Sequence, residues 1–280
     1  MDVKRHARTR FSRSAEQYVQ SAILAEGDEL SLMVRLARLT GSERVLDVAT
    51  GGGHTALAFA PHAREVVATD LAPAMLEAAE RHLARRGAGN VRFEVADAEA
   101  LPYAEAEFDV VTARYAPHHF PDPQAFLAEA FRVLRPGGRL VMFDNMAPED
   151  DELDSFMNQF EKWRDPSHVR AHRSTEWQRM LNAAGFEVES AEALVRKPYG
   201  FDEWTARQSM PEPDRQDLAR WLLEAPPRCV EFFRIRAEGA RVLSLEATFG
   251  LISAHVKTLL RSSGEYPGAA PREGARLSGE

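Results

Sequence analysis

Cysteine is nearly absent from this sequence, because Cys229 is the single one among 280 residues. One cysteine cannot form a disulfide within the chain, and it cannot supply the several thiolates of a cysteine-bound metal cluster. The sequence therefore predicts neither an internal disulfide nor a metal site.

Long apolar runs and large basic blocks are also missing. No stretch approaches the roughly 18 apolar residues of a membrane-spanning helix, and the basic segment 4–10 (KRHARTR) lacks the apolar core of a signal peptide. With 35 Lys and Arg against 43 Asp and Glu, the formal net charge is −8, which disfavours binding to a phosphate backbone. We expect a cytoplasmic protein without a membrane span or a nucleic-acid partner; a homodimer is left open.

The sequence does contain a regular alternation of short apolar strands and longer helical segments. Strands are expected at 44–49, 65–69, 91–95, 108–113 and 138–143, and helices at 14–39, 53–61, 73–86, 98–101 and 123–135. Repeated strand–helix units with strands of buried type predict a parallel, doubly wound α/β sheet. Its ligand should lie beyond the carboxyl ends of the strands, beside the first one.

The character of the chain changes after residue 144. Helices are expected at 152–163, at 174–184 between a Ser174 cap and a Gly185 stop, and over 201–225; strands are expected at 186–196 and 249–257, with a turn at 238–239. The end of the chain, 261–280, is rich in Gly, Ser, Pro and charge, and we expect it to be disordered.

The stretch RVLDVATGGGHTALAFA joins a strand to a helix through three consecutive glycines. Because glycine has no Cβ, such a turn lets a ligand approach the backbone. Gly51, Gly53 and Ala56 satisfy the relaxed G-x-G-x-x-G/A dinucleotide fingerprint, and Asp70 follows at a distance suited to a ribose hydroxyl. A dinucleotide site and an ordinary turn without a ligand are therefore two open alternatives.

Neither alternative explains the other acids of this region. Asp47 lies within the first strand, and Asp97 and Ala98 follow the third. A buried carboxylate is costly unless it accepts hydrogen bonds, which backbone N–H groups or a ligand ammonium can donate. A cofactor with an α-amino group, a ribose diol and an adenine but no pyrophosphate would use all these features, and S-adenosylmethionine (SAM) is such a cofactor.

Four motifs in order, VLDVATGGG, VVATDLAPAMLEAA, EVADAEALPYAEAEFDVVTARYAPHHFPDP and VLRPGGRLVMFD, resemble the class I SAM-dependent methyltransferases. The likeness is to methyltransferase domain type 11, in particular the branch of ubiquinone and menaquinone biosynthesis. It is strong over 44–144 and weaker over 11–39 and 174–257. It implies a Rossmann-like seven-stranded sheet of order 3-2-1-4-5-7-6 with an antiparallel last strand.

The resemblance also implies a division of the chain. We expect an N-terminal helical cap segment at 1–40, a SAM-binding domain at 41–260, and an insertion at about 197–245 that caps the substrate. Candidate aromatic residues for the pocket wall are Trp163, Trp177, Trp204, Phe156, Phe160, Phe232 and Phe233.

Cofactor contacts are implied residue by residue. The methionine and ribose part of SAM would be lined by Asp47, Ala49, Gly51 and Gly53, and the adenine would be bound by Leu71, Met75, Asp97 and Ala98. Asp70 would hold both ribose hydroxyls, because one carboxylate can accept two donors. Arg114 would make a backbone contact at the methionine end, and Tyr18 would close over the cofactor.

The loop RYAPHHF places His118 and His119 where the acceptor of the family faces the cofactor. Histidine suits a proton acceptor, since its pKa lies near neutrality. Quinone-methylating relatives usually carry Arg-Asn at these positions, so a polyprenyl quinone is disfavoured.

We expect methylation of a small molecule on oxygen or carbon. The alternatives are a SAM-binding protein with non-methyl chemistry such as a cyclase, an NAD(P)-dependent oxidoreductase, and a nucleotide-binding regulator. The oxidoreductase is disfavoured because the sequence shows no catalytic pair of the Tyr-x-x-x-Lys type.

Overall fold

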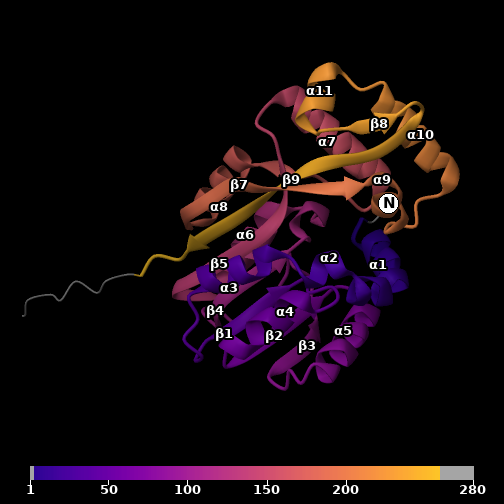
Figure 1. The fold of residues 1–280 in the computed structure, drawn as a ribbon. Coiled ribbons are helices and arrows are strands. Elements are labelled where there is room, and N and C mark those ends of the chain that lie inside the picture. Colours follow the sequence, from indigo (N-terminus) through magenta and orange to yellow (C-terminus); the bar gives the residue numbers. More distant parts are fainter. Residues whose placement is uncertain (1–2, 259–280) are drawn as a thin grey trace, which may run out of the picture.

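The computed structural model describes residues 3–258, so the disorder predicted for 261–280 lies outside the described residues. Its centre is one twisted sheet whose main strands follow the order β3-β2-β1-β4-β5-β9-β7 (Figure 1). In chain order this is 3-2-1-4-5-7-6, so the predicted topology is confirmed. Two short strands that were not predicted, β6 (His172–Arg173) and β8 (Arg236–Glu238), pair with β5 and β9.

Six of the seven main strands run in the same direction, and one runs against them. Five of the six lie side by side: β1 (Arg44–Val48), β2 (Glu65–Asp70), β3 (Val91–Val95), β4 (Phe108–Arg114) and β5 (Leu134–Ala147). The antiparallel strand β9 (Arg241–His255) lies between β5 and β7 (Glu187–Gly200). As expected for a parallel sheet, the strands are apolar on both faces: Val45 packs into one core cluster and its neighbour Leu46 into the other.

Three strands are longer than predicted. The predicted strand begins at residue 138, yet β5 begins at Leu134 because Gly137 N–H donates to the Val256 carbonyl at 2.9 Å, and Val256 N–H donates to the Gly138 carbonyl at 2.9 Å. Strands β7 and β9 continue pairing to Gly200 and Ser244, well beyond Phe249, where the pairing of β9 with β5 ends. Figure 1 shows β9 running from the sheet into the region where α7, α10 and α11 gather.

Helices cover both faces of the sheet. One face carries α3 (Asp28–Ala37), α4 (His54–Phe59) and α5 (Pro73–Arg85), and the other carries α6 (Pro123–Val133) and α8 (Ser174–Ala184). The helix predicted at 98–101 is wrong. Asp97 accepts a hydrogen bond from Glu99 N–H at 3.0 Å, and this side-chain-closed turn replaces it.

The N-terminal segment is three helices rather than the single one predicted at 14–39. They are α1 (Val3–Gln20), α2 (Ala22–Ala25) and α3, and Gly27, with extended backbone, begins α3. Ala15 and Val19 of α1 pack against Met75 and Ala78 of α5. Helix α1 is thereby docked over the end of the sheet where β1 and β2 finish.

The remaining helices form a cap on the upper ends of β7 and β9. They are α7 (Asp151–Arg164), α9 (Phe201–Ala206), α10 (Glu212–Leu223) and α11 (Pro227–Phe232). The helix predicted over 201–225 is therefore divided into α9 and α10. Pro226 and Pro227 then begin α11. Gly185 does end α8, with φ of 100°, but Arg173 caps it instead of Ser174, whose hydroxyl donates to the Ala191 carbonyl.

Candidate functional site

The three glycines of the turn serve helix packing as well as a cavity. Gly53 has φ of 81°, and a Cβ on it would lie 2.6 Å from Cδ1 of Leu83 in α5. A Cβ on Gly52 would lie 2.9 Å from the carbonyl oxygen of Tyr18 in α1. The sequence reasoning missed this need for Gly52, since the approach of α1 is a tertiary contact.

Two acids lie beneath and beside the turn. The Asp70 carboxylate accepts N–H bonds from Gly51 at 3.1 Å and Ala72 at 2.9 Å, and burial raises its pKa to about 6. Asp47 is 1% exposed and accepts a hydrogen bond from Thr50 Oγ1 at 2.6 Å, and burial raises its pKa to about 7. Asp47 therefore braces the turn from below instead of lining a cavity.

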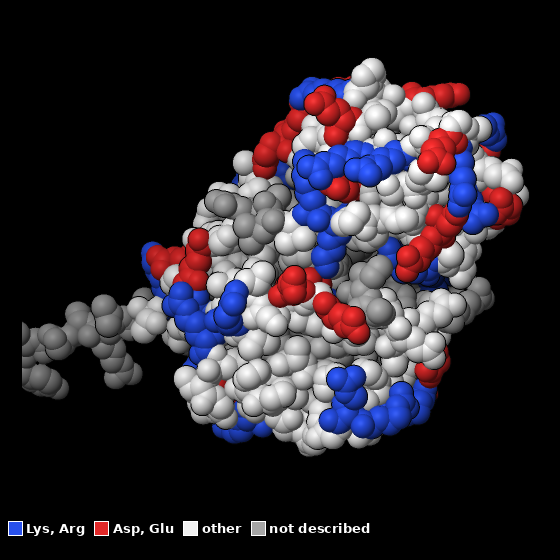
Figure 2. All heavy atoms as spheres, in the orientation of Figure 1, with Lys and Arg blue, Asp and Glu red and all other residues white. Residues whose placement is uncertain are grey.

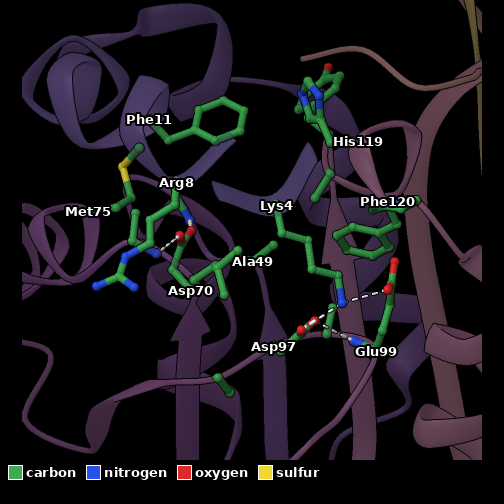
Figure 3. Close-up of a pocket in the computed structure, with 18 of the residues that line it drawn as sticks. Lys4, Arg8, Phe11, Ala49, Asp70, Met75, Asp97, Glu99, His119 and Phe120 are labelled. Atoms are coloured by element: carbon green, nitrogen blue, oxygen red, sulfur yellow. Dashed lines mark hydrogen bonds and ion pairs between the residues drawn. The ribbon is translucent and has the colours of Figure 1, made fainter. Parts of the chain in front are cut away.

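A cavity of about 110 Å³, here the first cavity, opens at these strand ends (Figure 3). Eight predicted cofactor residues line it: Tyr18, Ala49, Gly51, Asp70, Leu71, Met75, Asp97 and Ala98. Gly53, Asp47 and Arg114 do not. Ala49 and Tyr115, which follow the adjacent strands β1 and β4, have φ of 54° and 52°. Backbone strain at two neighbouring strand ends is typical of a functional site.

Helix α1 contributes side chains that the sequence reasoning did not assign. Lys4, Arg8 and Phe11 line the first cavity, and Figure 3 shows Lys4 reaching across it. The Lys4 Nζ atom lies 2.6 Å from Asp97 Oδ2 and 2.6 Å from Glu99 Oε2. Although burial alone would lower it, the Lys4 pKa is raised by these two carboxylates. The basic segment at 4–10 was the available signal.

Arg114 lies in a buried polar cluster behind the first cavity. Its guanidinium donates to Thr55 Oγ1 at 3.0 Å, to Glu29 Oε1 at 3.0 Å and to the Leu24 carbonyl at 2.6 Å. Glu29 also accepts from Lys197 Nζ at 2.9 Å. These contacts tie α2 and α3 to β4 and β7, so the side chain of Arg114 holds the N-terminal helices in place.

A second cavity, of about 360 Å³, adjoins the first. It is lined by α1, the loop after β4, α7, and the segments that follow β7. Tyr18, Tyr115 and His119 line both cavities, so these three residues form the junction between them. Of the predicted pocket-wall aromatics, Trp204 lines the second cavity, whereas Trp177, Phe160 and Phe233 are buried in the core.

The two predicted catalytic histidines have different environments. His118 places Nδ1 2.6 Å from Asp144 Oδ1 and donates its backbone N–H to Asp144 Oδ2 at 2.6 Å. Burial opposes protonation, but Asp144 outweighs it and raises the His118 pKa. Burial and the neighbouring His118 lower the pKa of His119 to about 3. The pair therefore comprises a histidine whose protonated form is favoured by Asp144 and a neutral imidazole at the junction.

The comparison with known proteins decides the family. Residues 46–142 match the family described as Methyltransferase domain. The chain is 38% identical over 227 residues to YcgJ of Bacillus subtilis, named an uncharacterized methyltransferase, covering 81% of this chain and 89% of that protein. The chain belongs to the SAM-dependent methyltransferases. The predicted resemblance is confirmed, and the cofactor of this methyltransferase is SAM.

Two further comparisons describe the methyltransferase. The crystal structure of BH2331 from Bacillus halodurans shares 40% identity with a TM-score of 0.81, covering 83% of this chain and 100% of that one. A demethylmenaquinone methyltransferase of Thermus thermophilus is 41% identical over 144 residues, which cover 49% of this chain and 65% of that protein. The fold is shared over most of the chain. The methyl acceptor that a relative's name implies applies to that relative alone.

The residues of the first cavity fit SAM chemically. Asp70 presents a carboxylate to a diol, Leu71 and Met75 are apolar, and Asp97 is an acceptor for an amine. Lys4 already uses one Asp97 oxygen, so its ammonium competes with such an amine.

The described residues show two further properties of the methyltransferase. Within 3–258, no group of three or more His, Cys, Asp or Glu side chains is placed to hold a metal ion, and no helix there is long and apolar enough to cross a membrane. On the described part of the face in Figure 2, acidic and basic side chains are interspersed.

Proposed function

We propose that this methyltransferase transfers the methyl group of SAM to an oxygen or carbon atom of a small molecule held in the second cavity. The observation that carries the proposal is the junction: Tyr18, Tyr115 and His119 belong to both cavities. An acceptor in the second cavity and a cofactor in the first would meet there, and alignment of this kind supplies much of the rate of a displacement reaction.

The first cavity is proposed to hold the cofactor through the residues that line it. Asp70 would accept from the ribose hydroxyls, Asp97 from the adenine amine, and Leu71 and Met75 would flank the ring. When bound, SAM supplies a methyl group on a sulfonium, which is electrophilic. Helix α1 covers this site with Phe11 and Tyr18, and excluding water protects that methyl group.

His119 is proposed as the proton acceptor. Its Nδ1 lies 3.1 Å from the Ser167 carbonyl oxygen, which can only accept, so Nδ1 carries the hydrogen and Nε2 has a free lone pair. The lowered pKa keeps the ring neutral at pH 7. A hydroxyl of the acceptor would donate its proton to Nε2 as the oxygen–methyl bond forms. His118, held by Asp144, would position the loop.

The cap elements α7 and α9 are proposed to enclose the acceptor. Their residues Arg164, Asp165 and Trp204, together with Tyr199 at the end of β7, line the second cavity. Of these residues, Tyr199 and Trp204 fall within the substrate-capping insertion that we expect from the sequence at about 197–245, whereas Arg164 and Asp165 lie outside it.

The test is a screen with methyl-labelled SAM over phenols, hydroxy acids, quinols and amines. His119→Gln should lower kcat for a hydroxyl acceptor, by less than the roughly 10² to 10⁴-fold that a general base usually contributes, because the lowered pKa weakens His119 as a base. Affinity for S-adenosylhomocysteine (SAH), measured by calorimetry, should not change. The matched control is His62→Gln, at an exposed histidine in the turn after α4.

Two outcomes contradict parts of the proposal. SAH binding without label transfer to any acceptor would favour non-methyl chemistry at the same site. An unchanged kcat in His119→Gln would remove its role as base while leaving methyl transfer in place.

A further inference from the structure

The charged residues that line the second cavity are mostly paired. Arg164 Nη2 lies 2.8 Å from Glu161 Oε2, and burial, which alone would lower the pKa of Arg164, is outweighed by Glu161 and Asp165. Asp165 Oδ1 lies 3.3 Å from Arg10 Nε and accepts from Ser167 N–H at 2.9 Å. These groups neutralise one another, so they do not select the charge of a ligand.

Arg207 is different. It follows α9 and lines the second cavity, with its guanidinium carbon 5.0 Å from the ring centroid of Tyr199. Within residues 3–258 its guanidinium takes part in no ion pair or hydrogen bond, and its Nε is buried without a partner. Burial lowers the pKa of Arg207, in contrast to Arg164. A guanidinium left in this state faces the cavity as an uncompensated cation.

Glu203 is the charge that could oppose this cation. It lies one helical turn before Arg207 and also lines the second cavity. Its side chain is exposed, however, and it forms no ion pair in the described part of the chain. Water screens an exposed carboxylate more than a half-buried guanidinium, so Arg207 dominates inside the cavity.

We infer that the methyl acceptor is a hydroxylated aromatic carboxylic acid whose carboxylate is bound by Arg207. The planar guanidinium matches a carboxylate with two parallel hydrogen bonds, and such pairs are strong and directional. Tyr115, Tyr199, Trp204 and Phe249 line the same cavity and provide flat apolar surface for an aromatic ring. The inference rests on the proposed function, because it specifies the occupant of the proposed acceptor site.

Binding of matched acids and amides tests this inference. The probes are 4-hydroxybenzoate and 4-hydroxyphenylacetate, each compared with its primary amide, titrated by calorimetry into the full chain saturated with SAH. At least one acid should bind about tenfold more tightly than its amide, as a charged hydrogen-bond pair provides.

Two variants should move this preference in opposite directions. Arg207→Gln should remove the preference for the acid, and Glu203→Gln should raise acid affinity a few-fold, with amide affinity unchanged in both. Arg207→Lys retains the charge without the planar fork and should recover part of the preference. Unchanged SAH affinity and melting temperature in each variant confirm that the fold is intact.

Three results would overturn the inference: equal affinity of acids and amides, no binding by either acid, or a preference that persists in Arg207→Gln. The proposed function fails separately. If a neutral phenol is methylated while the acids do not bind, the proposed function stands without the inference. If the acids bind through Arg207 but no acceptor receives the label, the inference stands and methyl transfer does not.

Discussion

The first and second cavities share three residues, yet the chain builds them in different ways. The first is formed mainly by strand ends and the turns directly after them, such as Ala49 after β1 and Leu71 after β2. The second joins segments from distant parts of the chain, from Gln17 in α1 to Phe249 in β9. The cofactor half therefore depends on local motifs, whereas the acceptor half depends on tertiary packing and can change without disturbing the motifs.

Gly52 offers the largest test of this separation, because it is a motif residue that touches the helix shared by both cavities. Gly52→Val should place its side chain against the Tyr18 carbonyl and displace α1, at a cost of about 1–3 kcal/mol for overpacking. We expect faster proteolysis within α1 and weaker SAH binding. Gly89→Val is the control, because a Cβ there meets nothing within 4 Å. If α1 stays protected in Gly52→Val, the close approach does not hold the helix.

Asp70 tests the cofactor half alone. Asp70→Asn keeps the shape of the side chain but removes the charge, and SAH binding should weaken by about 1.5–3 kcal/mol through loss of charged hydrogen bonds. Affinity for acceptors in the second cavity should stay the same, because Asp70 lines only the first. Calorimetry with SAH measures the change, with Asp202→Asn, at an exposed residue of α9, as control. If acceptor binding weakens equally, the two cavities do not bind their ligands independently.

Asp47, beneath the turn of the first cavity, should make the stability of the fold depend on pH. An unfolded aspartate titrates near 4, and burial raises the pKa of Asp47 in the fold to about 7. Between these values the folded state retains a proton that the unfolded state releases, so stability falls as pH rises. One such proton changes the free energy of unfolding by on the order of 1 kcal/mol per pH unit.

Urea unfolding of the unaltered protein and of Asp47→Asn between pH 6 and 7 isolates Asp47 by difference, because Asp70 and the buried histidines that also titrate in this interval are common to both proteins. Relative to the unaltered protein, Asp47→Asn should gain stability as pH rises through this interval. A slope equal to that of the unaltered protein would show that another group carries the proton.

Lys4 should give the smallest effect. Its ion pairs with Asp97 and Glu99 are about a third exposed at Lys4, so each contributes at most about 1 kcal/mol. Lys4→Met should raise SAH affinity up to about fivefold at low salt, and the difference should shrink as salt increases. Lys257→Met, which removes a similar pair with Glu187 at an exposed lysine, should leave SAH affinity unchanged. Weaker binding in Lys4→Met would instead make Lys4 a cofactor contact.

The sequence predicted the sheet well because its strands carry their own signal. Apolar runs at β1, β2 and β4 are bounded by turns, and the family motifs supplied the strand order. Errors arose where a side chain or a partner strand decided the conformation: Asp97 closes a turn at 98–101, and Val256 extends β5 through a proline and two glycines. Such contacts are not visible in periodicity.

The same distinction decides which residues of the site could be predicted from the sequence. Most predicted cofactor residues line the first cavity, since the motifs place all of them except Tyr18 and Met75 close to a strand end. The backbone of Arg114 stays a predicted cofactor contact, whereas no motif reveals that its side chain turns toward Glu29, which lies 85 residues earlier. Arg207 and Lys4 were not predicted, because only folding brings a lone arginine to the second cavity and an N-terminal lysine to Asp97.

Strand β9 links the two halves mechanically. Its 15 residues pair with β7 over nearly their whole length, with β5 at one end and with β8 at the other, so one continuous strand belongs to both the sheet and the cap. The cap cannot swing away without breaking that ladder. Helix α1 pairs with no strand of the sheet, so its displacement would leave this ladder intact. Because α1 lines both cavities, movement of this helix would open both at once. Release of SAH and of the methylated product would then share a step.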